Sequence, residues 1–204
     1  MKTAVLLSGQ LRTFAQTWPS QRWHLLRHFP GFELFICVQD TPEIQFVDTL
    51  RAELGTDRVH LAARQDPDLS EHLTPALTAA YHWAPYTNAA PAHQLLLQHY
   101  YQAEVWKFFR TLRDPDDYAT IIRTRGDNLF HDFTPPPRDA FFFNTCYTPR
   151  GFGRFGGVND RCAVMGAEAA GIYFRVWDAI PALIKARCPF HPETLLKATL
   201  EMES

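Results

Sequence analysis

Residues 3–9 read TAVLLSG, a continuous apolar run that suits a buried parallel strand feeding a loop. A second apolar run, ELFICV, occupies 33–38, and a short third one, RVHLA, occupies 58–62. The stretches between these runs, at about 13–29 and at 44–54, carry apolar residues at helical spacing. This β-α-β-α-β order predicts a parallel sheet with crossover helices.

The second half of the chain continues the α/β pattern after an irregular stretch. Residues 64–92 have no clean period and read as an insertion with room for one short helix. The clearest helix follows at 93–113, with an apolar stripe predicted to contain Leu97, Tyr101, Val105, Phe108 and Leu112. The other predicted elements are strands at 118–124 and 161–166, a helix at 167–180 and a final helix that opens at Pro192. We therefore expect residues 1–204 to form a single α/β domain, with a mostly parallel, Rossmann-like sheet and helices on both faces.

Composition narrows the classes of partner. The chain has 204 residues and a formal net charge of −2 at pH 7, so nothing indicates a groove for nucleic acid or an anionic membrane surface. The apolar run near the N-terminus is too short for a signal peptide or a membrane span, so none is expected. The four cysteines lie far apart without CxxC spacing, which favours buried free thiols over zinc ligands. A reducing cytoplasm fits that pattern.

Polar residues follow three of the predicted strands. In an open parallel sheet, ligands bind where loops leave the carboxyl ends of the strands. The first strand is followed by Ser8, Gly9, Gln10 and Arg12, the second by Asp40, and the fourth by Arg125, Asp127 and Asn128. All three loops should open on the same edge of the sheet, which makes this edge the predicted ligand site.

Asp127 stands out because it follows two arginines in the segment RTRGD. Strand alternation puts Arg123 and Arg125 on one face, and Asp127 continues that side if the chain stays extended. Arginine beneath a buried layer needs an anionic partner, because an unpaired buried charge is costly. One interpretation is a site that holds a phosphate group and its divalent metal. The other is an internal Arg–Asp salt bridge without a ligand.

Three further segments admit both a functional and a structural interpretation. Asn159 and Asp160 could contact a ligand, or could form an ordinary turn or cap. His191 and Glu193 precede or open the last helix, where such residues are often structural. The glycine- and arginine-rich segment 148–158 is predicted to be a flexible loop whose Arg150 and Arg154 could grip a diphosphate or simply lie on the surface. It lacks the GK[ST] ending of a Walker loop.

Five separated motifs in this order resemble one known group of proteins. They are SGQLR, FICVQD, YATIIRTRGD, GGVNDRCAVMG and FHPETLL. Together they are similar to small glycosyltransferase-like proteins of the GT-A type, in which an R-x-R-x-D strand end stands in place of the usual metal-binding D-x-D. The resemblance spans Val5 to Leu200. It implies a GT-A-like fold and a nucleotide-sugar donor bound over the carboxyl ends of the strands.

The resemblance also implies roles for particular residues. Ser8, Gly9, Gln10 and Arg12 would line the nucleotide pocket, with Asp40 near the base or ribose. Asp127 would bind Mn²⁺ or Mg²⁺ that bridges the donor diphosphate, steadied by Arg123 and Arg125. Asn159 and Asp160 would face the donor sugar or the acceptor, and His191 would be a possible second metal ligand with Glu193 close by. The one aspartate in place of two leaves metal dependence open. Segment 64–92, with Tyr81, Trp83 and Tyr86, is the candidate acceptor-side loop.

The expected reaction is transfer of a sugar to a glycan or other acceptor. Positive charge would stabilise the leaving diphosphate, and Asp160 could take the acceptor proton if the anomeric centre inverts. Three alternatives remain: a non-catalytic nucleotide- or sugar-binding protein of the same fold, a nucleotidyl or phosphoryl transferase, and an interaction module with a closed ion-pair network and no cleft.

Overall fold

The computed structural model describes residues 2–83, 91–137, 144–150 and 156–202. The strands are β1 (Lys2–Gly9), β2 (Glu33–Gln39), β3 (Val59–Arg64), β4 (Tyr118–Arg125), β5 (Cys146–Tyr147) and β6 (Ala163–Met165). The α-helices are α1 (Phe14–Ser20), α2 (Phe46–Leu54), α3 (Pro75–Trp83), α4 (Ala92–Leu112), α5 (Ala167–Tyr173), α6 (Val176–Lys185) and α7 (Pro192–Met202). The prediction of an α/β fold is confirmed.

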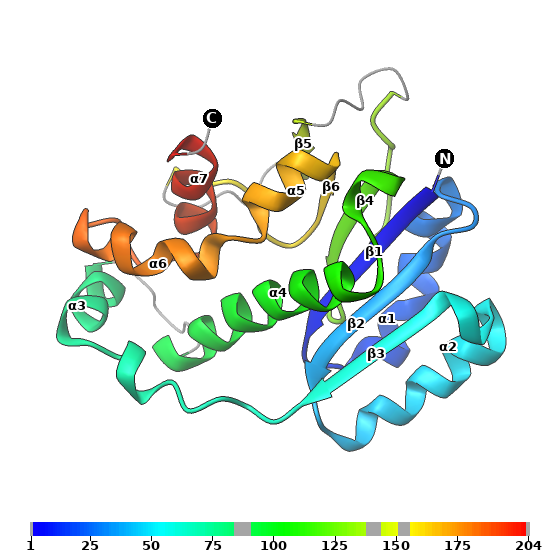
Figure 1. The fold of residues 1–204 in the computed structure, drawn as a ribbon, viewed down its shortest axis with the longest axis horizontal. Coiled ribbons are helices and arrows are strands. Elements are labelled where there is room, and N and C mark those ends of the chain that lie inside the picture. Colours follow the sequence, from blue (N-terminus) through cyan, green and yellow to red (C-terminus); the bar gives the residue numbers. More distant parts are fainter. Residues whose placement is uncertain (1, 84–90, 138–143, 151–155, 203–204) are drawn as a thin grey trace.

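The sheet has six strands in the order β3-β2-β1-β4-β6-β5 (Figure 1). β1, β2, β3 and β4 run parallel, so their carboxyl ends meet at one edge as predicted. β6 pairs antiparallel with both β4 and β5. The sheet is therefore mixed at the β5 edge and parallel where the predicted site residues lie.

Helices cover both faces of the sheet, as the sequence predicts. Strand alternation gives β1 two apolar faces, since Val5 and Leu7 point into one cluster while Ala4 and Leu6 point into another. The first cluster includes residues of α1 and α2. The second includes residues of α3 to α7. β1 is a continuous apolar run because it is buried on both sides.

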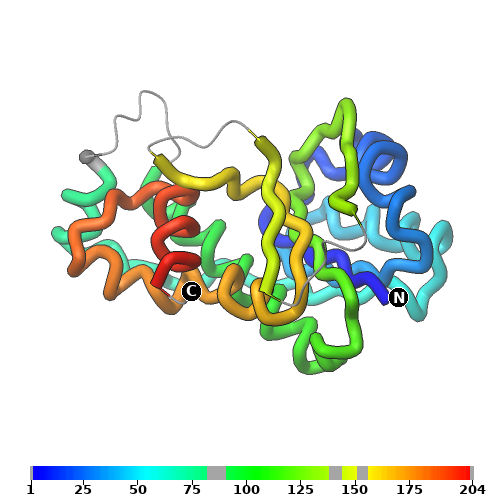
Figure 2. The backbone as a smooth tube through the Cα atoms, turned by 90° about the horizontal axis from the view of Figure 1, so that it is seen from above, coloured from blue at the N-terminus to red at the C-terminus, as the bar shows by residue number. Residues whose placement is uncertain are grey.

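α4 crosses the sheet and extends beyond it. It contacts β1 and β2 on the sheet and α6 at its other end. Figures 1 and 2 show α3, α6 and α7 gathered at this end of the molecule. Because α4 packs on both a sheet and a helix, its buried surface is wider than the predicted stripe. The stripe is confirmed at Tyr101 and Val105 but wrong at Leu112, which is exposed, while Phe109 is fully buried.

Two segments that the sequence predicts to be single continuous helices are divided in the structure. The helix expected over 13–29 is α1 followed by a π-helical turn (Gln21–Leu25) and a 3₁₀ turn (Leu26–His28). Pro19 lies inside α1 and has no backbone N–H to donate to the helix. The single helix expected over 167–180 is two helices, because the chain turns at Phe174 and Arg175. This turn keeps α5 on β4 while α6 packs on α4 and α7.

The described part of segment 64–92 contains the one short helix that the sequence allowed. It contains a 3₁₀ turn (Ser70–His72) and α3, which contacts α6. Tyr81 packs against the core cluster on this side of the sheet. Residues 84–90, with Tyr86, and the centre of the 148–158 loop, with Arg154, lie outside the described residues. Arg150 is exposed. Within the described ranges, no helix combines the length and apolar character that a bilayer span requires.

Candidate functional site

A cavity of about 440 Å³ opens at the carboxyl edge of the sheet, between the ends of β1 and β4 and the first half of α4. Its position is the one that open parallel sheets use for ligands. The lining residues are Ser8, Gly9, Gln10, Arg12, Thr13, Gln39, Asp66, Gln94, Leu95, Leu97, Gln98, Tyr101, Arg123, Arg125, Gly126 and Asp127. The structure thus brings seven of the predicted site residues together, from the ends of β1 and β4 and the loops that follow them, more than a hundred residues apart in sequence.

Two glycines shape the loops that frame this cavity. Gly9 ends β1 with a φ of 107°, a backbone conformation that disfavours any residue with a Cβ. Gly126 follows β4, and a Cβ added there would lie 2.9 Å from the backbone oxygen of Gln10. The absence of a side chain at Gly126 therefore allows the loop after β4 to approach the loop after β1.

Arg125 and Asp127 form a bidentate pair at the cavity. Arg125 Nε donates to Asp127 Oδ1 at 2.8 Å, and its Nη2 donates to Oδ2 at 2.7 Å. Burial raises the pKa of Asp127, but the hydrogen bonds and charge of Arg125 outweigh it and bring the pKa below the ordinary value. The Asp127 side chain is still 52% exposed, so the pair contributes little to folding stability. Its geometry fixes the direction of the Arg125 guanidinium.

Arg123 lies one pleat deeper and is only 1% exposed. Its Nη1 donates to the backbone oxygen of Asp160. Its Nε has no acceptor among the residues that the structure describes, although buried N–H groups in folded proteins are nearly always bonded. Arg123 therefore places a buried positive charge directly beneath the cavity.

Gln98 of α4 links Arg125 to Asp160, the residue that accepts a hydrogen bond from Arg123. Its Oε1 accepts from Arg125 Nη1 at 3.0 Å, and its Nε2 donates to Asp160 Oδ2 at 2.5 Å. Sequence reasoning missed this residue, because a glutamine beside a predicted apolar stripe looks like part of a solvated face. Only the position of α4 on the sheet shows that Gln98 reaches Arg125.

A second chain of hydrogen bonds lies on the β2 and β3 side. Asp66 Oδ1 accepts from Tyr101 at 2.7 Å, and its Oδ2 accepts from Gln39 Nε2 at 2.9 Å. Gln10 Nε2 donates to Gln39 Oε1 at 3.2 Å. The predicted Asp40 does not line the cavity; its Oδ2 accepts from Gln65, and its neighbour Gln39 takes the lining position. The sequence missed Asp66 because it lies in the irregular stretch after β3.

The remaining predicted site residues lie outside the cavity lining. Asn159 and Asp160 are buried, and Asn159 Oδ1 accepts from the backbone of Arg161, which is the bond of a local turn. His191 and Glu193 are buried at the start of α7, where Val158 N donates to Glu193 O at 3.1 Å. Burial lowers the pKa of His191 to about 4. Asp160 is linked to the cavity through Gln98 and Arg123.

The donor set around Asp127 does not fit a divalent cation as the side chains stand. Mg²⁺ and Mn²⁺ take several oxygen ligands. Both oxygens of Asp127 are bonded to Arg125, and both oxygens of Asp66 are bonded as well. His191 is not among the lining residues. Over the part of the chain that the structure describes, no three His, Cys, Asp or Glu side chains gather into a possible metal site.

His99 of α4 is buried beneath the same network, with 1% of its surface exposed. Neither ring nitrogen has a hydrogen-bond partner among the described residues. Burial lowers its pKa to about 4; the Asp160 carboxylate opposes this shift and the Arg123 guanidinium adds to it. His99 is therefore neutral at pH 7 and leaves the charge of this layer to Arg123 and Asp160.

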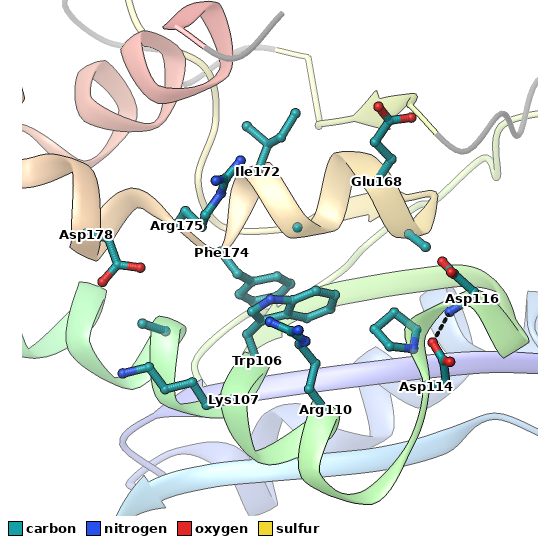
Figure 3. A pocket seen from close by; sticks show the side chains of 14 residues that line it. Trp106, Lys107, Arg110, Asp114, Asp116, Glu168, Ile172, Phe174, Arg175 and Asp178 are labelled. Carbon is teal, nitrogen blue, oxygen red and sulfur yellow. Dashed lines mark hydrogen bonds between the residues drawn. The ribbon is translucent and has the colours of Figure 1, made fainter.

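A second, larger hollow of about 960 Å³ lies between α4 and α5 (Figure 3). Trp106 stacks on Phe174 there, with ring centroids 5.3 Å apart, and Arg110 lies over the Trp106 ring. Asp114 and Asp116 at its rim precede β4, so this hollow is at the amino end of that strand. It contains none of the predicted site residues. We therefore place the candidate site at the carboxyl edge.

Comparison with known proteins adds no assignment. No protein-family model matches the chain, and a search of curated proteins finds no match. The functional argument therefore rests on the residues of the cavity.

Proposed function

We propose that this protein is a glycosyltransferase that moves a sugar from a nucleotide-sugar donor to a glycan or another acceptor. The observation that supports this proposal is the set of three arginines, Arg12, Arg123 and Arg125, around one cavity at the carboxyl edge of a parallel sheet. Arginine binds phosphate oxygens through its planar fork of donors. Gln10, Gln39 and Asp66 line the other side, where a ribose or a base would have to replace some of the hydrogen bonds that these side chains make with one another.

The arginines and Asp160 would lower the barrier of such a reaction in different ways. Departure of a nucleoside diphosphate places negative charge on the phosphate, and fixed guanidinium groups stabilise charge that develops at their position. An inverting transfer also needs a base near the acceptor hydroxyl. Asp160 remains our candidate for that base. Because Asp160 is bonded to Gln98, we expect the Gln98 side chain to move when an acceptor binds.

The metal, the acceptor side and the cellular setting also belong to this proposal. Mn²⁺ or Mg²⁺ was expected from the resemblance, and the bonded state of Asp127 argues that it is not bound there in this arrangement. The acceptor side is expected near segment 64–92. A cytoplasmic setting is also proposed, because the four cysteines are free thiols, which a reducing compartment preserves.

The proposal is tested by following thermal unfolding with UDP-, GDP- and CMP-sugars, each with and without Mn²⁺ or Mg²⁺. A ligand that binds only the folded state must raise the unfolding temperature, by an amount equivalent to about 2.7 kcal/mol at a hundred times its Kd. We expect at least one donor to stabilise the protein and to be consumed when an acceptor is supplied. No shift with any donor would remove the basis of the proposal.

A non-catalytic binding protein of the same fold is the second candidate. It is favoured by one observation: Asp160, the candidate base, is buried behind a hydrogen bond instead of lining the cavity. Donor binding without hydrolysis or transfer would identify this case. A nucleotidyl or phosphoryl transferase would instead release products cut at a phosphate oxygen. The interaction module was expected to have no cleft, so the cavity argues against it.

A further inference from the structure

We propose that the cavity binds the diphosphate of its ligand directly on arginine, without a bridging divalent cation, and that Asp127 is a positioning residue that holds Arg125 for this purpose. This inference rests on the proposed function, since it concerns how the donor diphosphate is held. It assigns Asp127 a different role from the metal ligand expected from the sequence.

The first argument is that the carboxylates of the cavity are already bonded. Asp127 accepts two N–H hydrogen bonds from Arg125, and Asp66 accepts hydrogen bonds from Tyr101 and Gln39. A cation at Asp127 would have to displace a bidentate guanidinium, which is one of the stronger pairings available to a carboxylate. Among the residues that the structure describes, the only other carboxylate of the lining is Asp66, and both of its oxygens already accept hydrogen bonds.

The second argument is charge. The described lining carries Arg12, Arg123 and Arg125 against Asp66 and Asp127, so three positive and two negative groups leave a net charge of +1. A diphosphate would be attracted into this field and a free divalent cation would be repelled from it.

The third argument is the count of free donors. A guanidinium has five N–H donors. Arg125 uses three of them, two on Asp127 and one on Gln98, which leaves two. Arg123 uses Nη1 on Asp160, and its Nε has no acceptor in the described part of the chain. Because the Arg123 Nε is buried, the donors that phosphate oxygens can reach from the cavity are the two remaining ones of Arg125.

The Asp127–Arg125 pair gives this site its orientation. Three hydrogen bonds hold Arg125, two to Asp127 and one to Gln98. Its remaining donors therefore have a fixed direction. A preorganised donor loses less entropy when the ligand binds. The carboxylate thus acts through Arg125 and needs no contact of its own with the ligand.

The first test uses the wild-type protein and compares EDTA with added Mn²⁺ or Mg²⁺. The probes are UDP, GDP and inorganic pyrophosphate, titrated by calorimetry. We expect the Kd of the bound nucleotide to agree within about twofold between the two conditions. Binding that appears only with metal, or that tightens about tenfold or more with it, would overturn the inference.

The same titrations separate this inference from the proposed function. If pyrophosphate binds without metal and no nucleotide or nucleotide-sugar binds, the arginine site stands and the glycosyltransferase proposal fails. If nucleotides bind but only with metal, the proposed function stands and this inference fails. If no probe binds in either condition, both fail.

The second test addresses Asp127 itself. Asp127→Asn should weaken nucleotide binding severalfold, by the same factor in EDTA and in Mn²⁺, and Asp127→Glu should restore part of it. In an Arg125→Gln background, Asp127→Asn should add little, because the residue acts through Arg125. Asp48→Asn is the matched control, since Asp48 pairs with Arg51 on the surface of α2 at 3.1 Å. An Asp127→Asn loss confined to the metal-containing samples would overturn the assignment.

Discussion

His99 is a fully buried histidine without a hydrogen-bond partner in the described residues. Its pKa of about 4 lies below the ordinary 6.5, so between these values the unfolded chain binds a proton that the folded chain does not. Stability is therefore fully present above pH 6.5 and is lost as the pH falls toward 4. The slope for one such group is at most about 1.4 kcal/mol per pH unit, or about 3 kcal/mol in all.

Replacing His99 by leucine should remove this part of the pH dependence. We expect His99→Leu to lose less stability than the wild type between pH 6.5 and 4.5, measured by urea unfolding at each pH. At pH 7 the variant should be as stable or gain about 1 kcal/mol, because two unbonded nitrogens are removed from the interior. His131→Leu, at an exposed histidine, is the control and should keep the wild-type slope. An unchanged slope in His99→Leu would show that the fold does not lower the pKa of His99.

Arg125 and Asp127 show how much of the candidate site could be predicted from the sequence. Their spacing and strand position predicted that they lie at the carboxyl edge, and the structure confirms this. Spacing left open whether Asp127 faces a metal or an arginine, and the structure shows the bidentate pair. That choice depends on side-chain rotamers, which a strand pattern does not encode. Gln98 and Asp66 were missed for a similar reason, because their neighbours come from other elements.

At the scale of elements, the site depends on how closely the loops after β1 and β4 approach. The strands themselves were predictable, because buried parallel strands are continuous apolar runs. The two-residue β5 and the π-helical turn were not, since both are too short or too irregular to leave a period in the sequence. The contact of Gly126 with Gln10 depends on the register of β1 against β4, which is a tertiary feature.

Gly126→Ala tests whether this approach matters. Its new Cβ would lie 2.9 Å from Gln10 O and 3.4 Å from Phe14 Cβ, so the loops must separate. We expect a loss of about 1–3 kcal/mol in the free energy of unfolding and a weaker donor response in thermal unfolding.

The matched control for this change is Gly171→Ala in α5, where an added Cβ meets nothing within 4 Å. There the exchange should stabilise the helix by about 0.5–1 kcal/mol. Equal effects of the two substitutions would contradict the importance of the Gly126 contact.

At the scale of the whole molecule, the sheet and α4 together create the site. α4 covers β1 and β2 with one part of its length and reaches α6 with another, which leaves Gln94, Leu97 and Gln98 over the strand ends. Sequence order predicted the strand edge but not the position of this helix over it, because helix placement depends on packing against α6. Composition alone could only argue against nucleic acid and anionic membrane surfaces as partners. Proposals for the ligand therefore rest on the charges that the fold brings together.

The most direct test of this account is calorimetric titration of nucleotide-sugar donors into the wild type and into Arg125→Gln. A hydrogen bond to a charged group contributes about 1.5–3 kcal/mol, and each 1.4 kcal/mol is tenfold in Kd. The account predicts that a donor binds the wild type and that its Kd rises about tenfold or more in Arg125→Gln, with folding intact. A donor that binds both proteins equally well, or no donor binding at all, would contradict it.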